Sequence, residues 1–234
     1  QALYVISRDG RVFALKADWR APVAGRWPLP VLRVDRLLPP PTAAAAARLV
    51  VACPGAPAPG GLAVIGNGAE SAAQPAPLLC TYTEDVYFER FWTRPAAAWR
   101  SALRWKPRGL LGFDFSTWGD LPFAPRLWAL YRSLWCTRYA QEAGLSVWPN
   151  LAYLLDDPAA VEASVETLPR GAYLAASFQT RAPQRAVYVD ALARALELLR
   201  RAGLLFYGVP ARRPREYDVA RRLCPRVDVV EPAY

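Results

Sequence analysis

From residue 77 onward, short apolar runs alternate with segments of helical periodicity, and this alternation constrains the fold more than any other feature. The apolar runs lie at residues 77–83, 109–115, 145–154, 172–180, 204–209 and 227–232, and helical segments lie between them at 95–103, 124–144, 156–167, 186–203 and 214–223. Nearly continuous apolar runs are typical of strands that are buried on both faces. The sequence therefore predicts an α/β fold in which helical crossovers join the strands of a parallel sheet.

Two architectures satisfy this pattern, an open doubly wound sheet and a barrel. No glycine-rich phosphate loop of the GxGxxG or P-loop type follows any of the strands, so the usual signature of the open nucleotide-binding folds is missing. The prediction is therefore a barrel-like, TIM-like sheet that is complete or incomplete. Closure to eight strands would need strands from the N-terminal part of the chain.

The chain is predicted to have two parts, a Pro/Gly-rich N-terminal extension at residues 1–76 and an α/β core domain at residues 77–234. Two short β-rich runs flank Asp9 and Gly10, and this dipeptide predicts a β-hairpin in the extension. No apolar run is long enough for a signal peptide or a membrane span. We therefore expect no membrane partner.

The chain carries a net charge of +9, and its basic residues are arginines except for Lys16 and Lys106. Arginine matches phosphate geometry and stacks on bases, which favours nucleic acid as a partner. The abundance of Ala, Arg, Pro and Leu is also what a GC-rich coding sequence would give, without any selected partner. Both explanations of the basic isoelectric point stay open at this stage.

Histidine is absent, and this excludes His-dependent catalytic triads and His-ligated metal sites. The four cysteines are Cys53, Cys80, Cys136 and Cys224, and none forms a CxxC pair. Such wide spacing indicates buried or free thiols in a reducing compartment rather than a zinc site or a disulfide framework. We expect a cytoplasmic protein.

Polar residues follow the predicted strands where their carboxyl ends should form one rim. The candidate catalytic residues are Glu84, Asp85, Asp114 and Ser116, and further rim residues are Asp120, Asn150, Gln179 and Tyr207. The acids suit a divalent ion such as Mg²⁺ or Mn²⁺, or an acid–base pair. Each acid can instead cap a helix or hold a loop. Ser116 as a nucleophile would lack a base.

Arginines and tryptophans share the helix at 124–144 and the loop before it. The candidate nucleic-acid contacts are Arg126, Arg132, Arg138, Arg181, Arg212 and Arg213, and the nearby tryptophans are Trp118, Trp128 and Trp135. Such a surface can stack and clamp single-stranded bases. The alternative is that the tryptophans belong to the core and the arginines are solvated or form salt bridges.

Three segments resemble a known family of uncharacterised proteins, DUF4417. They are TYTEDVYFERFWTRP, GLLGFDFSTWGDLPFAPRLWALYRSLW and GLSVWPNLAY, and the resemblance extends over residues 28–210. The family's D-D-x-x-F-E-R-x-W run is matched from Glu84, which stands where the family has Asp. Its D-F-S run is matched at Asp114, and its W-x-x-Y-R helix is matched from Trp128.

The DUF4417 resemblance implies a protein of bacteria, archaea, phages and plasmids, with no established activity. Together with the charge it predicts a mobile-element protein that engages nucleic acid through an arginine-rich surface, in replication or transfer. One alternative is a metal-dependent enzyme that acts on a phosphorylated or nucleotide-like small molecule at the rim. Another is a protein-binding accessory factor without chemistry.

Overall fold

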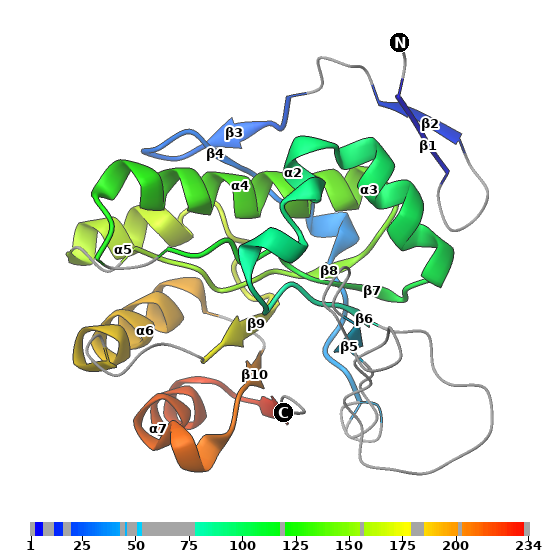
Figure 1. Ribbon diagram of the computed structural model, residues 1–234. Helices are drawn as coiled ribbons and strands as arrows, with labels where there is room; N and C mark the ends of the chain where they lie inside the picture. Colours follow the sequence, from blue (N-terminus) through cyan, green and yellow to red (C-terminus); the bar gives the residue numbers. More distant parts are fainter. Residues whose placement is uncertain are drawn as a thin grey trace.

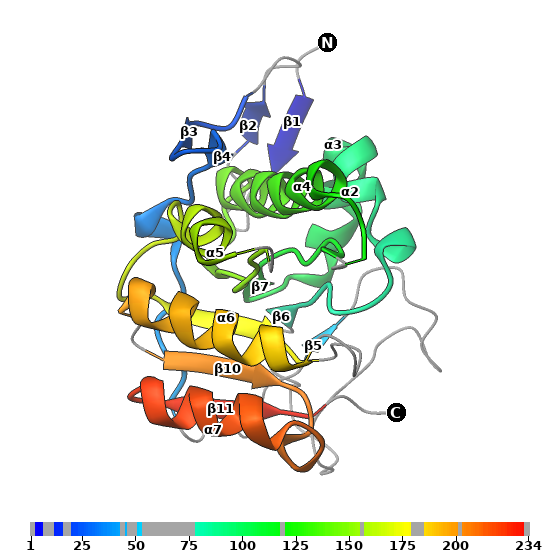
Figure 2. The same ribbon diagram turned by 90° about the vertical axis from the view of Figure 1, so that its left-hand side faces the viewer.

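The computed structural model describes residues 3–6, 12–15, 20–42, 45, 51–52, 78–117, 120–154, 157–178, 185–200 and 203–231. Figures 1 and 2 show these residues as helices and strands in colours that follow the chain. Within them, parallel strands alternate with helices from residue 78 to residue 230. The predicted α/β class and the order of its elements are confirmed.

The strands form two parallel ladders whose order follows the sequence. The first contains β5 (Val51–Ala52), β6 (Leu78–Leu79), β7 (Gly109–Leu111) and β8 (Val147–Trp148), and the second contains β9 (Tyr173–Ser177), β10 (Gly203–Tyr207) and β11 (Val227–Val230). A parallel bridge between Asn150 and Ala175 joins them, with Leu151 N donating to Ala175 O at 2.7 Å. A sequential order differs from that of doubly wound sheets, in which the order reverses.

Helices follow the strands and cover the sheet from outside. They are α2 (Arg90–Thr93), α3 (Pro95–Ala102), α4 (Phe123–Glu142), α5 (Pro158–Val165), α6 (Arg185–Leu199) and α7 (Pro214–Leu223), with short 3₁₀ turns η2 (Asp85–Tyr87), η3 (Leu103–Trp105) and η5 (Pro210–Arg212). Figure 1 shows α2, α3 and α4 above β6, β7 and β8, and α5, α6 and α7 lie side by side in Figure 2. Proline opens four of these elements, where its missing N–H is not needed.

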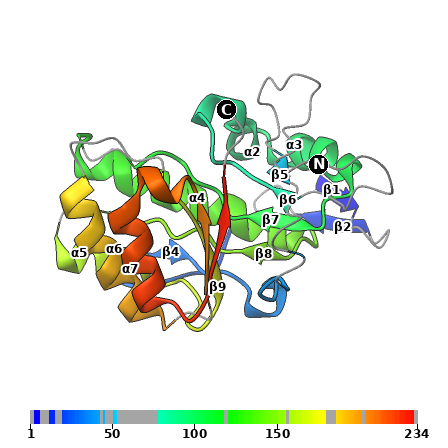
Figure 3. The ribbon, with the colours of Figure 1, turned by 90° about the horizontal axis from the view of Figure 1, so that it is seen from below.

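The sheet is curled, because side chains of distant strands meet on its inner face. Tyr82, which follows β6, and Tyr207 of β10 have ring centroids 5.0 Å apart. In a flat sheet these strands, four steps apart, would be separated by about 19 Å. The inner cluster takes side chains from six strands and the residues after them: Leu78, Cys80, Tyr82, Leu111, Trp148, Tyr173, Ala175, Leu205, Tyr207 and Val230. Figure 3 shows the strands turning from β11 round to β5.

Alternate residues of the same strands face the helices. Leu79, Leu110 and Val147 pack in one buried cluster with Trp99 of α3 and Tyr139 of α4. The corresponding residues of β9 and β10 pack in a second cluster with α5, α6 and α7. Burial on both faces explains the continuous apolar runs in the sequence.

The sheet does not close in the part of the chain that the structure describes, since no ladder joins β5 to β11. A parallel, sequentially ordered sheet is thus present, and a complete TIM-like barrel is not. The sequence pattern is the same for a closed and an open curled sheet, because closure depends on one pair of edge strands. No helix among the described residues is long and apolar enough to span a membrane.

The N-terminal part contains two antiparallel pairs. β1 (Leu3–Ile6) pairs with β2 (Val12–Leu15) in the register Leu3 to Leu15, as the hairpin prediction requires, whereas Asp9 and Gly10 lie outside the described residues. β3 (Val23–Ala24) pairs with β4 (Leu29–Pro30), and η1 (Val34–Arg36) follows. The chain then meets β8, where Leu38 N donates to Val147 O at 2.8 Å. The domain boundary at residue 76 stays a prediction.

Candidate functional site

The carboxyl ends of three neighbouring strands are linked by one asparagine. Asn150, two residues after β8, donates from Nδ2 to Asp114 Oδ1 at 2.9 Å. Its Oδ1 accepts a hydrogen bond from the hydroxyl of Tyr82 at 2.9 Å. Asp114 follows β7 and Tyr82 follows β6, so these bonds fix the ends of β6, β7 and β8 relative to one another. We call Tyr82, Asp85, Asp114, Ser116 and Asn150 the rim cluster.

The segment after β7 has a local sequence that sets the position of Asp114. A Cβ at Gly112 would lie 2.5 Å from Asn150 N, so only glycine allows this close approach to the chain after β8. Phe113 and Phe115 are buried on the helix side, where their backbone N–H groups donate to Thr137 and Ser133 of α4 at 2.9 Å. Because side chains alternate along an extended chain, Asp114 faces the opposite side.

The Asp114 carboxyl has an unusual proton affinity. Burial raises its pKa from 3.8 to about 6, and the negative charge of Asp85 adds to this shift, while the hydrogen bond from Asn150 opposes it. Two acids therefore meet at the rim, as the sequence predicted. A carboxyl that titrates near neutral pH is suited to give and take protons.

Asp85 holds the loop that carries Ser116. Its carboxylate accepts the Ser116 N–H at 3.2 Å on each oxygen and the Ser116 hydroxyl at 2.9 Å. With these bonds the Asp85 carboxylate fixes the position of the loop after β7. Glu84 and Asp120 are both exposed, and no contact joins either to the rim cluster in the described residues. The four predicted acids thus separate into a pair at the rim and two solvated side chains.

Three tyrosines lie at or near the rim cluster: Tyr82 after β6, Tyr207 in β10 and Tyr188 in α6. Burial, followed by the charge of Asp114, raises the pKa of Tyr82 and keeps its hydroxyl a hydrogen-bond donor. The Tyr207 ring is tilted by 50° against that of Tyr82, and the hydroxyl of Tyr188 in α6 donates to Ser177 O at the end of β9 at 3.4 Å. Sequence reasoning missed Tyr188, whose only signal is its place in the first turn of α6. Gln179 and Arg181 lie outside the described residues.

Few side chains at this rim are placed to bind a divalent metal ion. Among the described residues no group of three or more Cys, Asp or Glu side chains is placed to hold an ion. Asp85 and Asp114 supply two carboxylates, and Asn150 Oδ1 is already engaged by Tyr82. Magnesium can be held by one or two carboxylates when a substrate phosphate supplies further oxygens. A Mg²⁺ or Mn²⁺ site would therefore depend on its substrate.

The arginines of α4 make contacts within the protein. Arg132 pairs with Glu89 at 2.9 Å and lies 4.2 Å above the Phe115 ring. Arg138 pairs with Glu142 at 2.7 Å and donates to Val31 O at 2.6 Å. Arg126 is 7% exposed. These contacts agree with the alternative in which the arginines of this helix form salt bridges within the protein.

Arginines near the end of β10 are more accessible. Arg213 donates from Nε to Phe178 O at 2.5 Å, which ties η5 to the end of β9. Arg212 is exposed beside it. Arg215, Arg221 and Arg222 of α7 are also exposed, and no described acid pairs with them. Arg212 and Arg215, before and at the start of α7, therefore place exposed positive charge on the β10–α7 side of the rim, whereas Arg221 and Arg222 lie at the other end of α7.

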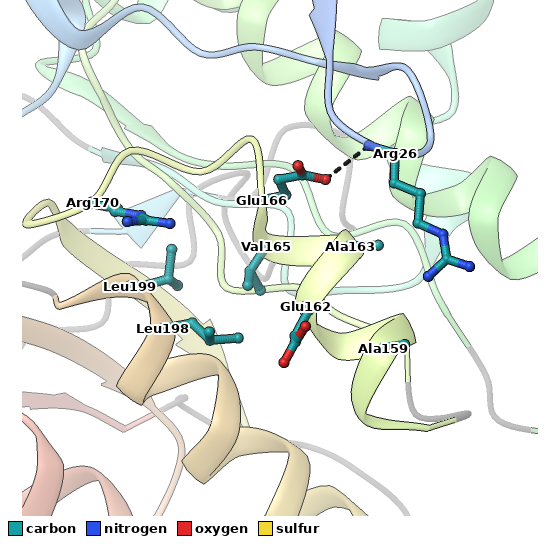
Figure 4. Close-up of a pocket in the computed structure, with 9 residues that line it drawn as sticks. All are labelled: Arg26, Ala159, Glu162, Ala163, Val165, Glu166, Arg170, Leu198 and Leu199. Carbon is teal, nitrogen blue, oxygen red and sulfur yellow. Dashed lines mark hydrogen bonds between the residues drawn. The ribbon is translucent and has the colours of Figure 1, made fainter.

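A separate pocket of about 330 Å³ lies between α5, α6 and the turn after β3 (Figure 4). Arg26, Glu162, Glu166 and Arg170 line it above an apolar floor that includes Leu199. Its lining comes from α5 and the segment after it, from the last two residues of α6 and from Arg26, so it contains no residue of the rim cluster.

Comparisons with known proteins agree with the motifs around this rim. The Gene 1 protein of Mycobacterium phage D29 is 33% identical over 113 residues, which cover 46% of this chain and 38% of that protein. The Gene 1 protein of Mycobacterium phage L5 is 38% identical over 77 residues, which cover 32% of each chain. The chain thus matches about a third of the length of these relatives.

The comparison with solved structures found no significant match. The profile of the family described as "Domain of unknown function (DUF4417)" matches residues 64–220, a span that includes the rim cluster and helices α2 to α6. This span is more than half of the sequence, and the chain therefore belongs to the DUF4417 family.

Proposed function

We propose that this chain is a phage-type protein that binds nucleic acid at the rim cluster and transfers a proton there through Asp114. The observation that carries the proposal is the half-buried Asp114 carboxyl at the carboxyl end of β7, held by Asn150 and with a pKa of about 6. Functional groups of parallel α/β sheets gather at this edge. Asp114 is the acid or base, and Asn150 and Tyr82 orient it.

The charge of the molecule supports a phosphate-bearing ligand. The net charge is +9, and the exposed Arg212 and Arg215 lie on the β10–α7 side of the rim. Arg126 and Arg138 take little part in this proposal because the first is buried and the second is held by Glu142 and Val31. The similarity to mycobacteriophage Gene 1 proteins supports a mobile-element context.

A metal-dependent reaction on a phosphorylated small molecule is the second candidate, favoured by the pairing of Asp85 with Asp114 at one edge. It predicts that Mg²⁺ or Mn²⁺ raises the melting temperature in the presence of a nucleotide, and that Asp114→Ala abolishes this rise. Under the first proposal the metal alone changes nothing. The accessory-factor alternative predicts neither nucleic-acid binding nor a metal effect.

The test of the first proposal uses the pH dependence of nucleic-acid affinity. An ionised Asp114 repels phosphate, so affinity should rise about fivefold as the pH falls from about 7.5 to about 5, which corresponds to about 1 kcal/mol for one charge contact. The chain contains no histidine, and few other groups titrate in this interval.

Asp114→Asn should remove most of this dependence, and Asp120→Asn should leave it unchanged because Asp120 is exposed away from the rim cluster. An affinity that varies with pH equally in the wild type and in Asp114→Asn would refute the assignment. So would the absence of any binding at about 50 mM salt.

The same observations support two further expectations. The sequential strand order and the inner cluster, in which Tyr82 meets Tyr207, favour an incomplete barrel whose mouth is the rim. The three described cysteines, Cys80, Cys136 and Cys224, are buried and are not joined in disulfides, which suits a reducing compartment such as the cytoplasm.

A further inference from the structure

Four aromatic residues form a patch on the outer side of α2 and α4, and we call it the aromatic platform. They are Trp92, Trp128, Tyr131 and Trp135. Trp128 and Tyr131 are stacked with centroids 5.6 Å apart and planes inclined by 5°. Trp92 meets the Trp128 and Trp135 rings edge-on, each at 5.1 Å. The packing fixes the orientation of these rings before any ligand arrives.

Trp128 is held in place without being buried. It is 49% exposed, although two aromatic neighbours contact it. Leu121 and Phe123 are exposed as well, but the Phe123 ring meets Trp27 at 5.2 Å and is not part of the aromatic platform. Exposed clusters of large apolar side chains mark surfaces that bind something. A rigid indole with an open side is suited to stack on another flat ring.

The charges around the aromatic platform favour a polyanion. Arg90 and Arg94 are exposed two residues before and two residues after Trp92, so they share a face of α2 next to the aromatic platform rather than the face of the Trp92 ring. Arg90 lies 5.5 Å from the centroid of the Phe91 ring, and no described acid pairs with either arginine. The nearby Glu89 is neutralised by Arg132 at 2.9 Å. Fixed aromatic rings and accessible cations on the same elements are what proteins use to hold single strands.

The aromatic platform is connected to the rim cluster through one side chain. Arg132 binds Glu89, three residues before Trp92, and lies over the ring of Phe115, which sits between Asp114 and Ser116. A strand that stacks on Trp128 would therefore lie on the elements that also carry the loop of the rim cluster.

We propose that the aromatic platform binds single-stranded nucleic acid, with a base stacked on Trp128 and the backbone held by Arg90 and Arg94. The proposal rests on the proposed nucleic-acid partner and adds the strandedness and the site of binding. Stacking requires an open base face, which a duplex does not offer.

The test measures the affinity of the full chain for a fluorescent oligothymidylate of about 12 nucleotides by anisotropy, beside the same sequence as oligouridylate and as a duplex. Trp128→Ala should weaken single-strand binding about tenfold, as expected for the loss of one stacked base, and Trp128→Phe should stay within about threefold of the wild type. Val34→Ala, at an exposed apolar residue outside the platform, is the matched control. Arg90→Gln and Arg94→Gln should each lower the salt slope by about 0.7.

Unchanged circular dichroism and melting temperature in Trp128→Ala would show that the variant folds, and Trp128→Phe provides the comparison if it does not. The inference is overturned by equal affinity of Trp128→Ala and the wild type, by duplex binding as tight as that of the single strand, or by Val34→Ala weakening binding equally. Similar affinity for the two single strands would identify both DNA and RNA as ligands, and a clear preference would identify the preferred one as the ligand. If Trp128→Ala loses affinity while the nucleic-acid affinity of Asp114→Asn varies with pH as that of the wild type does, the proton-transfer proposal is refuted and the single-strand proposal stands.

Discussion

Asp114→Asn is expected to stabilise the protein at neutral pH while it removes the proposed proton-transfer group. Asparagine keeps the size of the side chain and an oxygen that accepts the bond from Asn150, but it carries no charge. The folded-state pKa of Asp114 is about 6, above the usual 3.8, because burial disfavours the ionised form. Such a group stabilises the folded state fully below its unfolded pKa, and this contribution is lost as the pH rises through about 6.

The size of the effect follows from the pKa. A shift of about two units corresponds to about 3 kcal/mol in total, and about 1.4 kcal/mol of this develops between about pH 5 and about pH 8. The unfolding free energy of the wild type should therefore fall, relative to that of Asp114→Asn, by about 1.4 kcal/mol over this interval. The absence of histidine leaves this interval almost free of competing titrations.

Urea unfolding of the wild type, Asp114→Asn and Asp120→Asn at a series of pH values measures this difference. Asp120 is exposed, so its variant should follow the wild type at every pH. A difference between Asp114→Asn and the wild type that stays constant from about pH 5 to about pH 8 would refute the reasoning, because it would show that folding leaves the Asp114 pKa unchanged.

Four further variants test other parts of the structure. Ser116→Ala removes the 2.9 Å hydroxyl bond to Asp85 and should cost about 1 kcal/mol in urea unfolding, and no loss would show that this bond is unimportant. Arg138→Ala should lower the melting temperature and leave nucleic-acid affinity unchanged, whereas Arg215→Ala should lower nucleic-acid affinity and leave the melting temperature unchanged; the opposite pattern would contradict the assignment of these arginines. Gly112→Ala places a Cβ 2.5 Å from the chain after β8, so a variant with wild-type stability would contradict the close approach there.

Local patterns predicted most of the secondary structure because the strands from β6 to β10 are buried on both faces. The helix predicted at 124–144 is α4 at Phe123–Glu142, and the helix predicted at 214–223 is α7 with the same bounds. The sequence could not predict whether the sheet closes, since closure depends on pairing between segments that are far apart in the chain. It also did not predict that Leu29 and Leu32 enter the core.

The candidate site was predictable in its position and less so in its connections. The sequence predicted that Asp114 and Ser116 follow a strand at its carboxyl end, and in the structure both residues follow β7. That Asp85 holds Ser116 depends on a contact over 31 residues, which a local pattern does not reveal. The contacts of Arg132 with Glu89 and of Arg138 with Val31 could not be predicted from a local pattern, because these partners lie on other segments, whereas the pair of Arg138 with Glu142 lies within α4.

The central claim is that nucleic acid binds at the rim cluster, and chemical-shift mapping tests it most directly. Titration of an isotope-labelled sample with a short single-stranded oligonucleotide should perturb the backbone amides of residues 112–116 and of Asn150. Residues around the pocket of Figure 4, such as Glu162 and Arg170, should stay unperturbed. Perturbations confined to that pocket, or none at residues 112–116, would contradict the account.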